Sequence, residues 1–316
     1  MTDTPTKPTP FNTGGQYIWD STSLKLATTC LRKYQYKLID GWTGLQPSPH
    51  LIFGQHYATA LEHYHKHIAL GVAEDEALYL IVKEVMFNTW SHDYDPEGFP
   101  IPETGAPWLS TDQYKTRENL VRTIVWYLDE FGADDAMQTY ILSDGKPAVE
   151  HSYKLPIDNG IVLSGHIDRL VEYSGDLYVT DNKTTKSAIS PYYFRQFDLD
   201  IQMSGYTFAG KMIYNLPVKG VIIDAAQIAI GFSRFGRAPT MRSEDQLNEW
   251  LDETMGTIET ARKAFTEQRF PRNLTSCSDY GGCEFREICS VPRDHRAAFL
   301  KGNFNKGIPW NPAVPR

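Results

Sequence analysis

Two short segments, Gly165-His166-Ile167-Asp168-Arg169 and Asp181-Asn182-Lys183-Thr184, contain the residues that decide the fold. The apolar residues around them predict two neighbouring strands, and Ser174-Gly175 between them predicts a turn. Residues two apart on a strand point to the same face, so we expect Asp181 and Lys183 to lie side by side. A hairpin of this kind would bring Asp168 opposite them.

Two carboxylates and a lysine in this arrangement suit the hydrolysis of a phosphodiester. That reaction needs oxygen ligands for Mg²⁺ or Mn²⁺, a positioned water and a cation near the developing charge. An Asp-x-Lys pattern is also common on exposed strands that have no catalytic role. Here Ile167, Val171 and Val179 indicate central strands, where an unpaired charge is costly. The pattern therefore predicts a functional site.

The rest of the chain predicts an α/β protein with a mostly helical N-terminal half. Helices are expected over residues 21–37, 54–70, 75–90 and 111–131, with a long surface loop over 91–110. Strands are expected over 149–157, 161–171, 177–182 and 218–230, and helices over 191–214 and 243–268. The corresponding domains are a helical portion over 21–147 and a core over 148–270.

Composition limits the class of protein. The chain has 316 residues, a formal net charge of −8 and four cysteines. No apolar run is long enough to span a bilayer, and residues 1–15 lack the features of a secretory signal, so we expect a cytoplasmic protein. The negative charge argues against nonspecific coating of DNA but allows one local basic groove. Residues 1–20 and 301–316 are expected to be flexible ends.

The motif Gly-x-Ile-Asp-Arg followed by Asp-x-Lys-Thr resembles the core of RecB-like PD-(D/E)xK nucleases, which include CRISPR-associated adaptation nucleases and the AddB nuclease domain. Those proteins carry Gln-x-x-x-Tyr on the next helix, and Gln202-Met203-Ser204-Gly205-Tyr206 matches it. The resemblance implies a restriction-endonuclease-like core, a mixed sheet flanked by helices. It implies that Asp168 and Asp181 bind metal, that Lys183 is catalytic, and that Gln202 and Tyr206 support the site. The alternative for these last two is ordinary helix packing.

One part of the family pattern is altered. The related nucleases usually carry Gly-x-x-x-His-x-x-x-Glu on an N-terminal helix, and Gly54 and Glu62 fit its ends, but Ala58 occupies the histidine position. Glu62 is expected to supply a further metal ligand. His56 is interpreted as a surface residue rather than a replacement ligand. The other histidines of this helix, His63, His65 and His67, are expected to be solvated.

The four cysteines are Cys30, Cys277, Cys283 and Cys289. A reducing compartment disfavours disulfides, and structural zinc sites more often use cysteines two to four residues apart. The pattern resembles the iron–sulfur staple of RecB-like nucleases, which implies a [4Fe–4S] cluster that joins a lobe over residues 271–300 to Cys30. A structural zinc site and four unrelated buried cysteines are the alternatives.

The functional hypothesis is a Mg²⁺- or Mn²⁺-dependent DNA exonuclease that acts on single-stranded ends, with DNA favoured through the resemblance. Its setting would be DNA repair or recombination, with a helicase or recombinase as partner, and its origin a phage. Arg32, Lys33 and Lys37, interleaved with Tyr34 and Tyr36, would suit a single strand, although a solvated helix face explains them equally well. The rival hypothesis, favoured by Ala58, is a non-catalytic DNA-binding or recombination scaffold that keeps the fold and the cluster.

Overall fold

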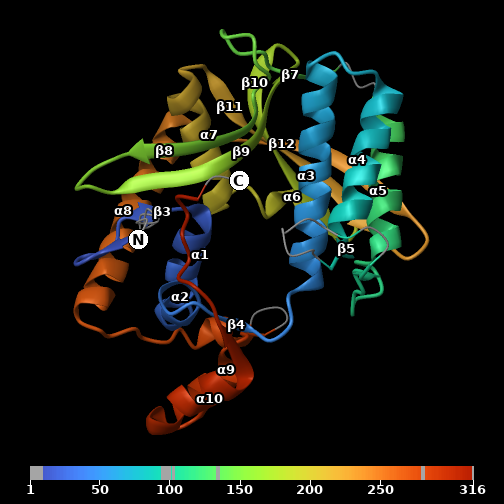
Figure 1. Ribbon diagram of the computed structural model, residues 1–316. Helices are drawn as coiled ribbons and strands as arrows, with labels where there is room; N and C mark the ends of the chain where they lie inside the picture. The colour runs from blue at the N-terminus through green and yellow to red at the C-terminus, as the bar shows by residue number, and fades with distance from the viewer. Residues whose placement is uncertain (1–9, 94–100, 102–103, 133–135, 279–281, 315–316) are drawn as a thin grey trace, which may run out of the picture. The chain divides into compact units, whose positions relative to one another are not determined.

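The computed structural model describes residues 10–93, 101, 104–132, 136–278 and 282–314, as Figure 1 shows. The chain forms two compact units, and each is discontinuous in sequence. Unit 1 comprises residues 1–46, 152–166 and 243–316, and unit 2 comprises 47–151 and 167–242. This division differs from the consecutive domains expected from sequence, because the strands β8 (Val149–Pro156) and β9 (Val162–Tyr173) each run through both units.

Unit 2 contains most of a mixed sheet. Its strands are β7 (Met137–Thr139), the second half of β9, β10 (Asp176–Thr185), β11 (Val218–Ile228) and β12 (Ser233–Met241). The order is β12-β11-β10-β9, with β7 also paired to β9. Strand β10 is antiparallel to β9 and parallel to β11, and β12 is antiparallel to β11. The central strands are rich in buried valine and isoleucine, as expected of strands covered on both faces.

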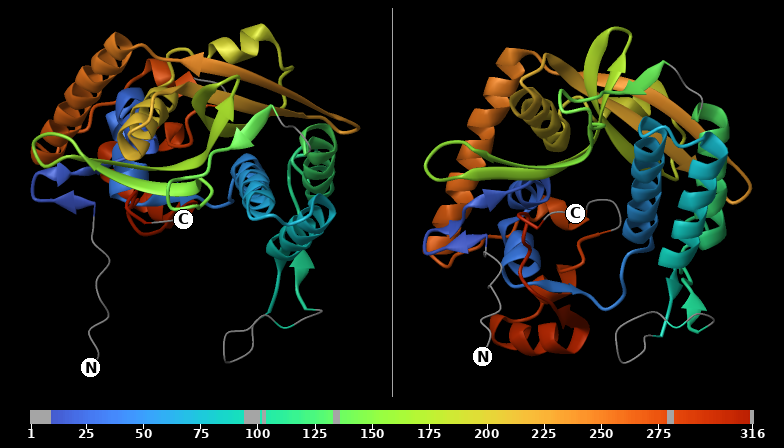
Figure 2. Two further views of the ribbon diagram at one scale, coloured as in Figure 1. Left: turned by 90° about the horizontal axis from the view of Figure 1, so that it is seen from above. Right: turned by 45° about the horizontal axis from the view of Figure 1, so that its top comes forward.

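Helices cover both faces of this sheet. The helices α3 (Pro49–Ala69), α4 (Glu74–Asn88) and α5 (Arg117–Phe131) lie side by side (Figures 1 and 2). Their apolar faces form a core with Ala226 and Ile228 of β11. Helix α7 (Ile201–Tyr214) packs on the opposite face, where a Cβ at Gly210 would lie 3.1 Å from the Val179 side chain. The protein is therefore a mixed α/β protein with a central mixed sheet flanked by helices.

Unit 1 holds the two described ends of the chain. Its shorter elements are β1 (Phe11–Asn12), β2 (Gly15–Gln16), β3 (Ile18–Trp19), α1 (Ser21–Thr29), α2 (Leu31–Tyr34), the π-helix η1 (Gln35–Ile39) and β4 (Trp42–Gly44). The C-terminal part of the same unit contains α8 (Glu244–Thr266), η2 (Thr275–Ser278), α9 (Arg286–Ser290), η3 (Arg293–His295), α10 (Arg296–Asn303) and β13 (Phe304–Lys306). Helix α1 packs against α8, and β3 pairs in parallel with the start of β9.

Residues from both ends that were expected to be flexible make contacts within unit 1. Trp19 is fully buried and stacks on Tyr34. Burial of the large apolar surface of an indole is favourable. Near the C-terminus β13 pairs with β4, and the carbonyl of Pro312 accepts a hydrogen bond of 2.8 Å from Ser164 Oγ. Residues 1–9 and 315–316, which were also expected to be flexible, lie outside the described residues.

Three other expectations from sequence are corrected in detail. The helix expected over 191–214 is two helices, α6 (Pro191–Arg195) and α7, because Asp200 caps the second one. The helix expected over 21–37 is interrupted at Cys30, whose backbone is extended. The loop expected over 91–110 lies partly outside the described residues, and its described ends form β5 (Trp90–Ser91) and β6 (Ala106–Pro107). No helix among the described residues is long and apolar enough to cross a membrane.

A buried polar network ties α5 to the sheet of unit 2. The Tyr127 hydroxyl donates a hydrogen bond to Asp224 Oδ2, the same oxygen that accepts one of 2.9 Å from Arg237 Nε. A second guanidinium nitrogen of Arg237 donates to the Tyr127 oxygen at 2.7 Å. Burial, and then the charge of Asp224, raises the pKa of Tyr127, so the hydroxyl stays protonated. The network thus pairs the charges of Asp224 and Arg237 inside the core through Asp224 Oδ2.

Tyr127→Phe is expected to lower the free energy of unfolding by about 1–2 kcal/mol, because it leaves Asp224 and Arg237 without one buried partner. Urea denaturation of the variant measures this loss. Tyr64→Phe is the matched control, since the Tyr64 hydroxyl lies in the same core but makes only a long bond of 3.5 Å to the Gly132 carbonyl. Equal losses in both variants would contradict a special role for the network.

Candidate nuclease site

Two strands of unit 2 place the predicted acidic residues next to each other. In the antiparallel pair of β9 and β10, Thr180 lies opposite Arg169, and the next residues along the two strands are Asp181 and Asp168. Both aspartates are buried. Residues opposite each other on paired strands share a face, so the two carboxylates belong to the same face of the sheet.

Lys183 connects this face to helix α7. Its Nζ lies 2.5 Å from Asp181 Oδ2 and donates a hydrogen bond of 3.0 Å to Gln202 Oε1. Gln202 Nε2 in turn donates to the Tyr206 hydroxyl at 2.9 Å. The strand spacing of two and the helix spacing of four therefore produce one continuous chain of polar contacts from Asp181 to Tyr206. For Gln202, the structure shows a direct contact with Lys183 in addition to helix packing.

Helix α7 is fixed at its first turn. Asp200 caps it by accepting hydrogen bonds from the backbone N–H groups of Gln202 at 2.8 Å and Met203 at 3.3 Å. An acidic N-cap is favourable because the first amides of a helix have no partner inside the helix. The cap holds Gln202, in the first turn, at a defined distance from Lys183. An aspartate is a common N-cap, but the sequence did not reveal this one because a single helix was expected over residues 191–214, with Asp200 in its interior.

Helix α3, which carries Glu62, packs on the other face of the sheet. Gly54 and Glu62 lie on α3, and a Cβ at Gly54 would lie 3.7 Å from Thr184 Oγ1. Thr184 follows Lys183 on β10 and therefore points to the opposite face. Glu62 is buried. Across the described parts of the chain, no three His, Cys, Asp or Glu side chains are grouped so that they could hold a metal ion. A metal-binding role for Glu62 stays a prediction.

Tyr193 is a neighbour of the site that the sequence did not reveal. It lies on α6, and burial together with the nearby charge of Asp181 raises the pKa of its hydroxyl to about 12. Its ring packs edge-on against Phe194 and Phe197, with centroids 5.4 and 5.7 Å away. Nothing in the spacing along the chain links position 193 to position 181, because only the fold brings α6 back to β10.

The histidines of α3 have different surroundings from those expected. His63 is half-buried and contacts Glu84 at 2.7 Å and Glu150 at 3.5 Å. Burial, and then Arg169 and Arg237, lowers the pKa of His65 well below its ordinary value. The expectation of solvated helix-face histidines is therefore wrong for these two. His56 is also half-buried, and burial lowers its pKa.

The cysteines all belong to unit 1, and two of them, Cys30 and Cys277, contact Asn273. The backbone N–H of Asn273 donates to Cys30 Sγ at 3.4 Å, and the Cys277 thiol donates to the Asn273 carbonyl at 3.6 Å. The N–H of Cys283 donates to the Cys277 carbonyl at 3.3 Å. Burial raises the pKa of Cys289. The nearby charges of Arg32 and Arg272 oppose this rise, whereas the Cys283 and Cys30 thiols add to it. All four are free cysteines.

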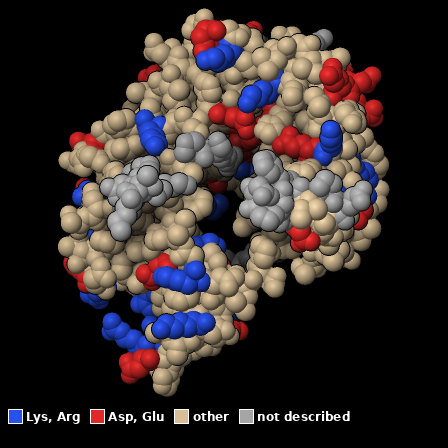
Figure 3. All heavy atoms as spheres, viewed as in Figure 1, with Lys and Arg blue, Asp and Glu red and all other residues tan. Residues whose placement is uncertain are grey.

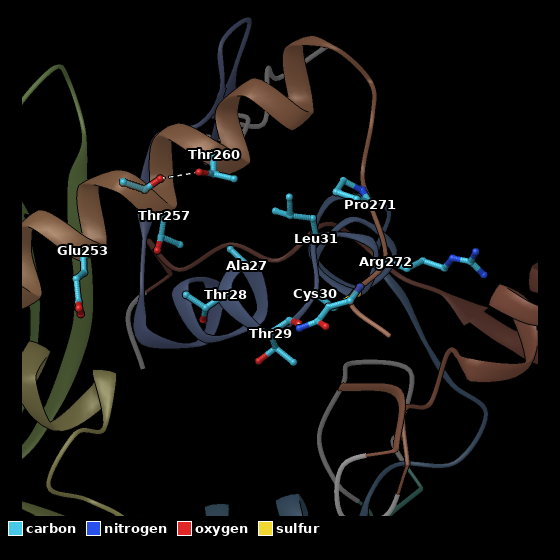
Figure 4. A pocket seen from close by; sticks show the side chains of 12 residues that line it. Ala27, Thr28, Thr29, Cys30, Leu31, Glu253, Thr257, Thr260, Pro271 and Arg272 are labelled. Atoms are coloured by element: carbon cyan, nitrogen blue, oxygen red, sulfur yellow. Dashed lines mark hydrogen bonds between the residues drawn. The ribbon is translucent and has the colours of Figure 1, made fainter. Parts of the chain in front are cut away.

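Cys30 also borders a cavity of about 600 Å³ in unit 1. Figure 4 shows Glu253, Thr257 and Thr260 along α8 on one wall and residues of α1 on the facing wall. Arg272 and Asn273 complete the lining beside Cys30. The cysteine region is therefore open on one side rather than tightly filled by side chains.

The basic and aromatic residues after Cys30 are mostly engaged within unit 1. Arg32 Nε donates a hydrogen bond of 2.8 Å to the Phe270 carbonyl, and Lys37 pairs with Glu284 at 2.6 Å. Tyr34 and Tyr36 are buried, which leaves no aromatic face for a base. The structure therefore favours a role in the packing of unit 1, rather than in binding a nucleic-acid strand, for these residues. The face seen in Figure 3 carries interspersed acidic and basic side chains, in keeping with the net charge of −8.

Comparison with known proteins gives the family. The sequence model of the PD-(D/E)XK nuclease superfamily matches residues 21–290, which include every residue of the candidate site and all four cysteines. No curated protein matches. The crystal structure of SSO0001 is similar over 76% of each chain, with 9% sequence identity and a TM-score of 0.29, values too low to inform the site. By the match over most of its length, the chain belongs to the PD-(D/E)XK nuclease superfamily.

Proposed function

We propose that this protein is a Mg²⁺- or Mn²⁺-dependent nuclease that removes nucleotides from single-stranded DNA ends. Membership of the superfamily suggests nuclease activity and a nucleic-acid substrate. The observation that carries the proposal for this chain is the contact series from Asp181 through Lys183 and Gln202 to Tyr206. A helicase or recombinase that exposes single strands during DNA repair or recombination would supply such a substrate.

The side chains present suit a divalent cation. Asp168 and Asp181 offer carboxylate oxygens, which Mg²⁺ and Mn²⁺ prefer, and both lie on one face of the sheet. A bound ion would lower the pKa of a water molecule and stabilise charge on the phosphate. Lys183 supplies a fixed ammonium beside this face, because Gln202 and Asp181 hold it from two sides. Because an ammonium can only donate, the amide oxygen of Gln202 faces Lys183 and the amide nitrogen donates to the Tyr206 hydroxyl.

A cleavage assay tests the proposal. End-labelled linear single strands, circular single strands, duplex DNA and RNA of matched sequence are each incubated with the protein and Mn²⁺. We expect stepwise shortening of the linear single strand, intact circles, and no reaction in EDTA. Asp181→Asn, prepared in parallel, reports any contaminating nuclease. Intact substrates in every reaction of the wild-type protein would contradict the proposal.

A second candidate function has one observation in its favour. Ala58 stands where related nucleases carry a histidine. A site with fewer ligands would bind metal weakly, and the protein would then act as a DNA-binding scaffold. Gel-shift binding of single strands together with the absence of cleavage at millimolar Mn²⁺ would favour this function.

We also propose that the four cysteines hold a [4Fe–4S] cluster with a structural role. Thiolates are the ligands that such clusters require, and a cluster is a larger body than one metal ion. Two of the thiols, Cys30 and Cys277, contact Asn273, and Arg32 and Arg272 lie near Cys289, where their charges would offset that of a thiolate. Cys30 would thereby be joined to the chain end that carries the other three, closing a long loop.

Anaerobically purified protein is expected to be brown, with a broad absorbance at about 400 nm from thiolate-bound iron. Cys289→Ser should lose this absorbance and unfold at a lower temperature, because one ligand and one link in the loop are gone. Iron and sulfide analysis, with zinc measured in the same samples, provides the readout. A colourless protein that contains stoichiometric zinc would instead support a structural zinc site.

A further inference from the structure

A cavity of about 540 Å³ in unit 2 opens directly after the strand that carries Asp181 and Lys183. It is lined by Ser187, Ala188, Ser190, Tyr192, Tyr193, Arg195 and Gln196. The lining begins two residues after β10 ends at Thr185 and includes most of α6. Its volume falls within the range of about 300–1,000 Å³ that is typical of small-ligand sites. Its residues have no part in the contact series of the proposed nuclease site.

The walls of this cavity are held in place by contacts on two sides. On one side, Ile189 lies against β12, where a Cβ at Gly236 would come within 2.8 Å of the isoleucine Cγ2. On the other side, the Phe197 carbonyl accepts a hydrogen bond of 2.7 Å from Arg242, whose Nε also donates to Ser204 of α7 at 2.9 Å. The loop is therefore anchored at both ends, which makes the cavity a preformed one.

The lining combines the groups that bind a nucleotide. Tyr192 is 83% exposed, so its ring is accessible to a flat partner. Arg195 is exposed three residues further along, and its guanidinium suits a phosphate. The hydroxyl and amide groups of Ser187, Ser190 and Gln196 offer hydrogen bonds to the edge of a base. Aromatic rings with a nearby cation are the usual means of holding single-stranded nucleic acid.

Tyr193 connects this cavity to the proposed nuclease site. It lines the cavity and also lies close enough to Asp181 for the carboxylate charge to affect its hydroxyl. Its ring is clamped between Phe194 and Phe197, which leaves the neighbouring Tyr192 as the free aromatic of the pair. The chain also runs from Lys183 through Thr185 directly into the lining residues, so a single strand whose phosphate reached Asp181 would lie near the cavity.

We infer that the cavity binds the base of a nucleotide adjacent to the phosphodiester held at Asp181 and Lys183, with Tyr192 stacked on the base and Arg195 on its phosphate. The inference rests on the proposed nuclease function for the position of that phosphodiester. The ligand class is a single-stranded nucleotide, because a paired base has no free face for Tyr192.

Binding is measured by the fluorescence anisotropy of a labelled single-stranded DNA oligonucleotide in EDTA, where no cleavage occurs. Tyr192→Ala is expected to lower the affinity about tenfold, and Tyr192→Phe to leave it unchanged, since stacking needs the ring only. Arg195→Gln should weaken binding and reduce the slope of log affinity against log salt by about 0.7, the loss of one phosphate contact on a single strand. Tyr79→Ala, at another exposed tyrosine in unit 2, is the matched control.

An abasic nucleotide moved along the oligonucleotide locates the base. The wild-type protein should lose affinity at one position near the end, and Tyr192→Ala should bind all positions alike. If Tyr192→Ala matches the wild type in affinity and in its response to the abasic site, the base-binding cavity is wrong, even if the wild type cleaves DNA. If base-dependent binding through Tyr192 is seen but no cleavage occurs in Mn²⁺, the cavity is supported and the nuclease function is not.

Discussion

Replacing Lys183 with methionine is expected to slow phosphodiester cleavage by about a thousandfold or more, with a smaller change in the affinity for DNA. Preorganised charges that face the developing charge of a transition state contribute on this scale. Lys183 is preorganised, because Asp181 and Gln202 fix its ammonium at 2.5 and 3.0 Å. Single-turnover cleavage of an end-labelled single strand in Mn²⁺ measures the rate.

Lys219→Met is the control for this loss. Lys219 lies on the neighbouring strand β11 and is exposed, and its Nζ lies 3.8 Å from Asp176. Its variant should cleave at the wild-type rate. Equal rates for Lys183→Met and the wild type, at equal thermal stability, would remove Lys183 from the reaction and leave the contact series with a structural role only.

Lys115→Met is expected to stabilise the protein, by roughly 2–4 kcal/mol at pH 7, given about 1.4 kcal/mol for each unit of pKa shift. Lys115 is 1% exposed, and its Nζ lies 4.4 Å from the centre of the Phe53 ring. Within the described residues this nitrogen has no hydrogen-bond partner. Burial lowers the pKa of Lys115 to about 7, an effect that Asp112 opposes and Lys186 reinforces.

The gain should depend on pH in a defined direction. In the unfolded chain the pKa of a lysine is about 10.4, so between about pH 7 and pH 10 the unfolded state binds a proton that the folded state has released. Wild-type stability therefore rises with pH across this window. The advantage of the methionine variant should shrink toward pH 10. Urea denaturation at pH 7 and pH 10 measures this gain, with Lys146→Met as the control because the Lys146 side chain is 77% exposed. A gain that grows with pH would contradict the explanation.

Local patterns in the sequence predicted that Asp181 and Lys183 lie together. The alternation of strand residues was enough to place Asp181 beside Lys183, and the observed ion pair follows it. The spacing of four residues on a helix likewise placed Gln202 and Tyr206 in contact. The strand expected over 177–182 extends to Thr185, so it carries Lys183 as well as Asp181. These features depend on residues close in the chain, where periodicity is informative.

Contacts between distant residues could not be read in the same way. Tyr193 and Asp181 become neighbours only after α6 folds back, and Lys115 becomes buried only when α3 covers it with Phe53. Strand β12 was missed because Gly236, Pro239 and two arginines interrupt any strand-like pattern. Proline is tolerated there because β12 pairs on one side only, with β11.

The discontinuity of unit 1 has a consequence for biosynthesis. Residues 1–46 cannot complete their packing until residues 243–316 have left the ribosome, because both stretches belong to the same compact unit. At about 5–20 residues per second, the first helices wait roughly ten seconds or more for α8 and the last three cysteines. Unit 2 is complete sooner, at residue 242. Nascent chains arrested before α8 should therefore expose the apolar surface of α1 to chaperones, whereas the strands that carry Asp181 and Lys183 have already been synthesised.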